Sequence, residues 1–174
     1  RQDGRQPPAE AVILFGGVPG VRLFAAIKKT QAIHDVPLKL YSIFNPLGIR
    51  TLAGSLTLPA GSKDVLTVGA TNDGLDILED YSAQGPGNSG VLKPDLVAPA
   101  RMTTATFGGS GFPGTSASAP IVAGAAALAL SAYPNMSPNE VQAFLEQRAL
   151  DLGAPGKENA YGAGRLNLGP PPDV

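Results

Sequence analysis

Cysteine and tryptophan are absent from this 174-residue sequence, and histidine occurs once, at His34. Without cysteine, the chain forms no disulfide, offers no thiol nucleophile and cannot build a Cys/His zinc site. Charged residues make up only 16% and sum to a net charge of −1, which argues against nucleic acid or an anionic membrane as a partner. Any Ser-His-acid mechanism run by this chain alone would have to use His34.

Long hydrophobic runs are also lacking. The longest weakly polar stretch, Ala117 to Tyr133, is mostly alanine and glycine, whereas a membrane span needs ~20 strongly apolar residues. We therefore predict a buried helix there and no membrane anchor. The opening segment, RQDGRQPPAE, has no apolar run and is not typical of a signal peptide.

The hydrophobic fraction of 43% suits one compact domain, and 22 glycines with 17 prolines predict many loops. We expect three regions: residues 1–10 as a linker or the start of a fragment, residues 11–168 as the domain, and residues 169–174 as a flexible tail. The Pro-rich composition of that tail indicates fraying.

Local patterns predict an α/β fold with a mainly parallel sheet and helices on both faces. An apolar run at 11–15, an amphipathic segment at 21–33 and a second apolar run at 38–44 form a strand-helix-strand unit. Residues 64–70 predict a third strand. The segments 46–63 and 81–115 are expected to be irregular, and long loops of this kind usually frame a binding or active site.

Two helices are expected towards the C-terminus. Residues 116–133 are apolar on every face, which predicts a central helix covered all round. Ser137, Pro138 and Glu140 form the start of another helix, with a serine cap, a proline at the first position and a glutamate that completes a capping box. Phe144 is its expected anchor in the core.

The sequence GTSASAP at residues 114–120 places Ser116 at the start of the apolar helix. Unpaired backbone N–H groups and the positive end of the helix dipole favour negative charge there. They could stabilise a tetrahedral oxyanion formed when Ser116 attacks a carbonyl. The alternative is that Ser116 only caps the helix, which is the commoner reason for serine at this position.

Several segments, in order along the chain, resemble the motifs of subtilisin-like serine proteases. GTSASAPIVAGAAAL at 114–128 resembles the family's nucleophile motif, in which Gly-Thr-Ser opens an alanine-rich helix. Four further matches are LPAGSKDVLTVGA at 58–70, YSAQGP at 81–86, KPDLVAP at 93–99 and YGAG at 161–164. The resemblance implies the C-terminal portion of a subtilisin-like domain whose N-terminal part is missing.

The resemblance also implies roles for individual residues. Ser116 would be the nucleophile and Asn45 would donate to the oxyanion, although Asn45 can also be a turn residue before Pro46. Phe44 stands where the family has a glycine beside the primary specificity pocket. The expected substrate-binding residues are Phe15, Gly16, Gly17 and Phe44.

The family's triad runs Asp, His, Ser along the chain, and its Asp and His precede the strand that Leu14–Gly17 resembles. The residues before Leu14 contain no histidine, and His34 is expected at the end of a helix. We therefore expect a portion of a serine endopeptidase that is inactive alone and needs the missing N-terminal portion. The alternative is a degenerate, non-catalytic module for binding or scaffolding.

Expectations about partners follow from the same resemblance. The intact protein would act on polypeptides, need no cofactor and lie outside the cytoplasm. Asp73, Asp76, Glu79 and Asp80 are expected to form a solvated turn, because their spacing matches no EF-hand calcium loop. The alternative is a structural calcium site, which the sequence does not support. Loss of strands would leave a sheet edge exposed, through which we expect self-association or a rearranged N-terminal segment.

Other motifs favour no competing function. GSGFPG at 109–114 satisfies a dinucleotide-binding pattern, but it lacks the preceding strand and following acidic residue that such a site requires.

Overall fold

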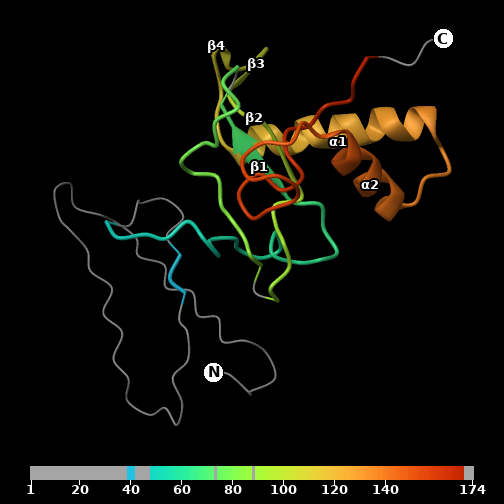
Figure 1. Ribbon diagram of the computed structural model, residues 1–174. Coiled ribbons are helices and arrows are strands. Elements are labelled where there is room, and N and C mark those ends of the chain that lie inside the picture. The colour runs from blue at the N-terminus through green and yellow to red at the C-terminus, as the bar shows by residue number, and fades with distance from the viewer. Residues whose placement is uncertain (1–38, 42–47, 73, 88, 171–174) are drawn as a thin grey trace, which may run out of the picture. The chain divides into compact units, whose positions relative to one another are not determined.

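Two parallel strands and a long helix form the centre of the structure, a computed structural model that describes residues 39–41, 48–72, 74–87 and 89–170 (Figure 1). The chain divides into Arg1–Lys39 and Leu40–Val174, and all described residues except Lys39 belong to the second unit. The elements expected at 11–15 and 21–33 lie outside the described residues, as do residues 1–10 and 171–174.

Strand β1 (Val68–Thr71) pairs in parallel with β2 (Leu96–Pro99), and Val68 lies opposite Leu96. Residues 164–166 extend this pair on the far side of β2, because Val97 N–H donates to the Gly164 carbonyl at 2.9 Å and Leu166 N–H donates to the Val97 carbonyl at 2.8 Å. The parallel arrangement predicted from the sequence is therefore present in the described part of the chain.

Helix α1 (Thr115–Ala132) packs across β1 and β2, and α2 (Pro138–Arg148) packs against α1. Their shared core consists of Leu96, Ala98, Val122, Ala125, Val141 and Leu145. Each of these side chains is less than a tenth exposed. The core is therefore made where α1 crosses β2 and meets α2.

The expectation that α1 is covered all round was wrong for the described structure. One face packs on the strands, while Leu128 on another face is 64% exposed. A helix that is apolar on every face is expected to be buried, but its burial depends on other segments that pack on each face. By length and composition α1 could also cross a membrane, although core helices of soluble proteins pass the same test.

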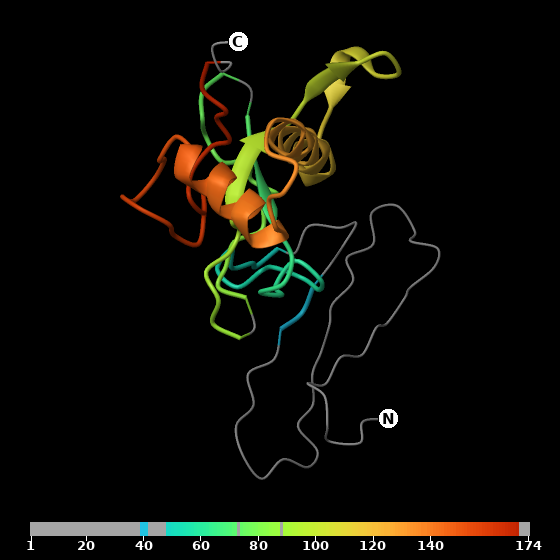
Figure 2. The same ribbon diagram turned by 90° about the vertical axis from the view of Figure 1, so that its right-hand side faces the viewer.

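The segment 81–115 is more regular than expected. It contains β2 and an antiparallel hairpin of β3 (Met102–Thr104) and β4 (Gly108–Phe112). The rings of Phe107 and Phe112 stack in this hairpin with centroids 4.9 Å apart. Figure 2 shows that the hairpin projects away from β1 and β2, directly before the start of α1.

One predicted strand has different bounds in the structure. The strand expected at 64–70 is shorter and begins at Val68, because the Thr67 N–H donates to the Asp95 side chain at 2.7 Å instead of joining the ladder. Lys39–Tyr41 is the described part of the run expected as a strand at 38–44. The rest of that run, residue 38 and residues 42–44, lies outside the described residues, so this strand stays a prediction.

Helix α2 begins where the sequence predicts. The Ser137 hydroxyl accepts from the Glu140 N–H at 3.4 Å, and the Glu140 carboxylate accepts from the Ser137 N–H at 2.8 Å. Leu145 is fully buried, whereas Phe144 is half-buried between Tyr133 and the Arg148 guanidinium. Leu145 is therefore the main anchor of α2, and Phe144 packs against the edge of the same core while remaining partly exposed.

Replacing Ser137 by alanine is expected to lower the free energy of unfolding by about 1 kcal/mol, as loss of a helix cap does. The side-chain and backbone hydrogen bonds from Ser137 hold the pKa of Glu140 below its ordinary value. A carboxyl with a lowered folded pKa stabilises above its unfolded pKa, and this contribution is lost as the pH falls through the folded value. The Ser137→Ala difference should therefore shrink in acid.

Urea unfolding at neutral and acidic pH measures this difference. Ser89→Ala, in an exposed turn, is the matched control and should change stability little at either pH. An equal loss in both variants would contradict the role of the capping box.

Candidate active site

The start of α1 carries the residue expected to be reactive. Gly114 is the N-cap, with φ 100° and ψ 163°, which is a backbone conformation that favours glycine. Ser116 is the second residue of the helix and is exposed. The alternative that Ser116 is merely the cap is therefore excluded, because Gly114 holds that position and no side chain makes a capping hydrogen bond.

The helix start is held in place from two sides. The buried Ser118 hydroxyl donates to the Pro99 carbonyl at 3.2 Å, which ties the first turn to the end of β2. The Gly114 N–H donates to the Tyr81 hydroxyl at 3.1 Å. The Gly114 carbonyl accepts from the Ala117 N–H at 2.9 Å, which closes the first turn.

The electrostatic environment of Ser116 favours negative charge. No acidic residue occupies the first turn of α1 and no side chain caps its end. The first N–H groups of a helix have no partner within the helix, and the helix dipole places partial positive charge at this end. An oxyanion beside Ser116 would therefore be stabilised by fixed backbone donors.

A shallow hollow of about 350 Å³ lies beside Ser116. Much of its lining is apolar and comes from the segment before β1 and from the outer side of α1. The apolar lining residues are Pro59, Ala60, Val65, Leu66, Val68 and Ala119. Ser116 thus lies at the edge of a largely apolar hollow.

The other residues that the sequence assigns to the site lie outside the described residues. They are Phe15, Gly16, Gly17, Phe44 and Asn45, together with His34. Their roles remain predictions, and the geometry above concerns Ser116 and its helix start.

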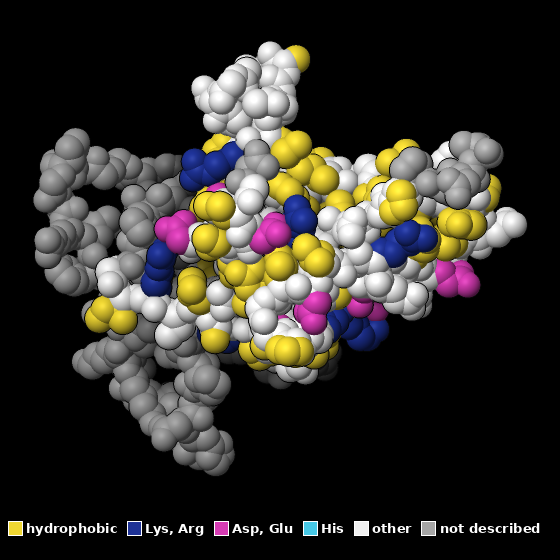
Figure 3. All heavy atoms as spheres, turned by 45° about the horizontal axis from the view of Figure 1, so that its top comes forward, with side chains coloured by type: hydrophobic (Ala, Val, Ile, Leu, Met, Phe, Trp, Pro, Cys, Tyr) yellow, Lys and Arg dark blue, Asp and Glu magenta, His cyan; other side chains and the backbone are white. Residues whose placement is uncertain are grey.

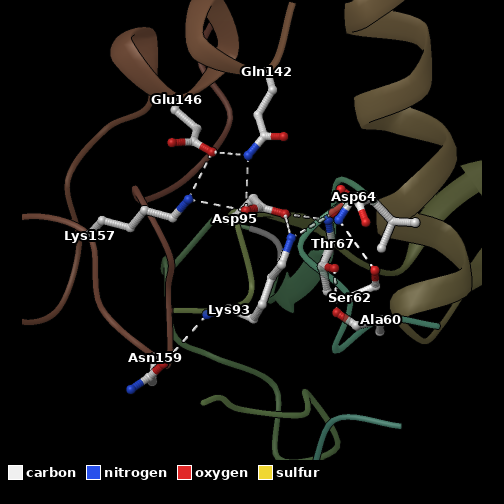
Figure 4. A network of polar contacts seen from close by, with 11 residues as sticks. Ala60, Ser62, Asp64, Thr67, Lys93, Asp95, Gln142, Glu146, Lys157 and Asn159 are labelled. Atoms are coloured by element: carbon white, nitrogen blue, oxygen red, sulfur yellow. Dashed lines mark hydrogen bonds and ion pairs between the residues drawn. The ribbon is translucent and has the colours of Figure 1, made fainter. Parts of the chain in front are cut away.

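A buried cluster of charged and polar side chains was not expected from the sequence (Figure 4). Lys93 and Asp95 are only 1% and 2% exposed, and the Lys93 Nζ lies 2.5 Å from the Asp95 Oδ2. The Lys93 Nζ also donates to the Val65 carbonyl at 2.6 Å. A buried ion pair of this kind needs such additional hydrogen bonds to offset the loss of hydration.

The second carboxylate oxygen of Asp95 reaches α2 and the loop after it. It accepts from Gln142 Nε2 at 3.1 Å and from Lys157 Nζ at 3.1 Å, and both donors also contact the Glu146 carboxylate. Burial alone would lower the pKa of Lys157, but the hydrogen bonds and charges of Glu146 and Asp95 outweigh it and raise that pKa. Lys157 therefore stays charged, and Asp95 joins the start of β2 to α2.

The acidic turn around residues 76–80 is a set of ion pairs. Each of its described carboxylates faces a different arginine, and the pairs are Asp76–Arg165 at 2.9 Å, Glu79–Arg101 at 3.1 Å and Asp80–Arg50 at 3.8 Å. Among the described residues no group of three metal-ligating side chains could hold an ion. The expectation that no calcium is required stays a prediction.

The YGAG segment at 161–164 closes the described structure against β2. Gly164 has φ 114°, and an added Cβ atom would overlap the Leu150 carbonyl oxygen. Backbone hydrogen bonds of 2.8 Å in both directions join Arg165 to Leu150 at this contact. Glycine is therefore required here by the close approach of two backbones.

Comparison with known proteins agrees with this arrangement. A model of the subtilase family, the S8 peptidases, matches residues 48–164. The chain is 35% identical over 118 residues to subtilisin Savinase of Lederbergia lenta, covering 66% of this chain and 40% of that protein. It is 32% identical over 112 residues to the halolysin-like extracellular serine protease Nep of Natrialba magadii, covering 63% of this chain and 19% of that protein.

A solved structure shows the same fold. The crystal structure of a lanthipeptide protease superimposes with a TM-score of 0.51 and 29% sequence identity, covering 63% of this chain and 40% of that one. The described structure is thus a partial subtilisin-like α/β fold. The chain belongs to the subtilase family of serine proteases, and it spans less than half the length of these relatives.

Proposed function

We propose that this chain is the C-terminal portion of a serine endopeptidase domain in which Ser116 is the nucleophile. The observation that carries the proposal is the exposed hydroxyl at the N-terminal end of α1, with no acidic residue in the first turn. The Ser116 N–H and the Asn45 side chain would donate to the oxyanion. The substrate would be a polypeptide.

The reaction needs groups that we place outside the described residues. Attack by Ser116 on a peptide carbonyl forms a C–O bond and requires a base to take the hydroxyl proton. The subtilase triad supplies that base as a histidine oriented by an aspartate. We propose that both come from a part of the domain upstream of the chain, which is consistent with its covering only 40% of subtilisin Savinase.

A non-catalytic module is the second candidate. Two departures from the family favour it: Phe44 replaces a glycine beside the specificity pocket, and Leu14–Gly17 reads LFGG where the family has SLGG. The upstream reading frame separates the two proposals. A D-[ST]-G and an H-G-T segment before Arg1 supports the protease, and their absence supports the module.

The purified 174-residue chain is expected to show little or no peptide hydrolysis, because Ser116 without a base keeps the reactivity of an ordinary alcohol. A fluorogenic peptide mixture, with a broad serine-protease inhibitor to identify contaminants, measures this. Adding the N-terminal portion as a separate fragment should restore turnover. Robust hydrolysis by the chain alone, lost on Ser116→Ala, would contradict the assignment of the base to another segment.

The proposed cellular location of the protein rests on the names of its relatives. They include proteases named as extracellular, so we place the parent protein outside the cytoplasm. Acidic and basic side chains are interspersed on the face shown in Figure 3, which is consistent with a partner other than nucleic acid. Exposed apolar residues on α1 support the proposal that the chain alone self-associates or needs the rest of its domain.

A further inference from the structure

The hydrogen bond between Tyr81 and Gly114 joins two segments that lie 33 residues apart. Gly114 precedes Ser116 by two residues and is the N-cap of α1. Its N–H donates to the Tyr81 hydroxyl at 3.1 Å. Because glycine has the greatest backbone freedom, its conformation here depends on such external contacts.

Tyr81 is itself anchored on β1. The next residue, Ser82, is 1% exposed, and its hydroxyl accepts from the Ala70 N–H at 3.0 Å. The Glu79 N–H donates to the Ala70 carbonyl at 2.9 Å, and the Ser82 N–H donates to the Glu79 carbonyl at 2.9 Å. Tyr81 therefore projects from a turn that is fixed to the sheet at both of its ends.

The Glu79–Ser82 turn also contacts Arg101, where the segment that runs through the β3–β4 hairpin to Ser116 begins. The Glu79 carboxylate lies 3.1 Å from the Arg101 Nε, and the Arg101 N–H donates to the Phe112 carbonyl at 2.9 Å. The β3–β4 hairpin thus leaves and returns next to the Glu79–Ser82 turn. Without Tyr81, the hairpin base and the Ser118–Pro99 hydrogen bond would remain to hold the start of α1.

We propose that Tyr81 is a positioning residue for Ser116: its hydroxyl fixes the Gly114 peptide and, through it, the direction of the Ser116 hydroxyl and N–H. This inference rests on the proposed role of Ser116. Displacements of ~1 Å at a reacting group can cost large factors in rate. One neutral hydrogen bond corresponds to a loss of roughly three- to tenfold.

The test compares Tyr81→Phe with Tyr161→Phe. The Tyr161 hydroxyl also accepts a backbone N–H, from Leu78 at 3.2 Å, so the control loses the same kind of bond in the neighbouring segment. The first measurement is the ¹⁵N–¹H spectrum and amide exchange of the 174-residue chain. Tyr81→Phe should shift the Gly114 and Ser116 signals and speed Gly114 exchange roughly three- to tenfold, whereas Tyr161→Phe should leave them in place.

The second measurement uses the full-length protein and the rate at which a fluorophosphonate modifies Ser116. In this reaction the Ser116 oxygen bonds to phosphorus, fluoride leaves and the proton passes to the enzyme's base. Tyr81→Phe should lower the rate roughly three- to tenfold relative to Tyr161→Phe at equal melting temperature, with reagent affinity unchanged.

The outcomes are distinct. An unmoved Ser116 signal in Tyr81→Phe, or an equal loss of labelling rate in both variants, overturns the positioning role. A wild-type full-length protein that is not labelled overturns the proposed function instead, and the inference about Tyr81 then stands or falls with the amide signals.

Discussion

Ser116→Ala is expected to abolish peptide hydrolysis by the full-length protein while leaving its folding almost unchanged. The side chain is exposed and the N-cap is Gly114, so loss of the hydroxyl removes no packing and no capping bond. The expected loss of kcat is about that of subtilisin itself, a member of this family, in which removal of the nucleophile lowers kcat ~10⁶-fold. Initial rates with a peptide substrate and fluorophosphonate labelling both measure it.

Ser131→Ala is the matched control, because Ser131 is an exposed serine in the last turn of the same helix. It should retain full activity and labelling. Turnover by Ser116→Ala comparable to that of Ser131→Ala would remove Ser116 from the nucleophilic role. A melting temperature that falls in Ser116→Ala alone would indicate a structural role instead.

The largest expected effect on stability comes from Asp95→Ala, which should lower the free energy of unfolding by about 3–5 kcal/mol. The substitution leaves the Lys93 ammonium buried without its carboxylate and removes the acceptor used by Thr67, Gln142 and Lys157. This is a large fraction of the ~5–15 kcal/mol that stabilises a typical domain. Urea unfolding of the 174-residue protein measures it.

Tyrosine fluorescence and circular dichroism can follow this unfolding, since the chain has four tyrosines and no tryptophan. Asp64→Ala is the control, because the Lys63–Asp64 pair is 73% and 71% exposed and should be worth less than ~1 kcal/mol. An Asp95→Ala protein already unfolded without urea agrees with the prediction. A loss no larger than that of Asp64→Ala would show that the buried pair is not stabilising.

Sequence reasoning succeeded where the signal is local. The start of α2 was predicted because Ser137, Pro138 and Glu140 act through bonds within one helical turn. The start of α1 was predicted to within one residue, and with it the position of Ser116. The family was correctly inferred from short motifs whose order along the chain is itself informative.

Prediction from the sequence failed where a structural feature depends on contacts between residues far apart in the chain. Lys93 and Asp95 are types that normally stay in water, and only the approach of Thr67, Gln142 and Lys157 makes their burial favourable. The β3–β4 hairpin was missed because β3 is only three residues long and glycines interrupt β4, which hides the alternation that marks a strand. The Tyr81–Gly114 bond has no local pattern at all.

The contacts of residues 164–168 determine where the C-terminal boundary of a shortened protein can be placed. The family match ends at residue 164, yet the Leu166 N–H donates to Val97 in the central strand at 2.8 Å and Leu168 packs against the core. The Arg148 side chain also donates to the Leu168 carbonyl at 2.9 Å. A boundary drawn at the end of the family match would keep the Gly164 contact but remove the Leu166 hydrogen bond to β2 and the packing of Leu168, so a fragment made for crystallisation or refolding should extend at least through Gly169.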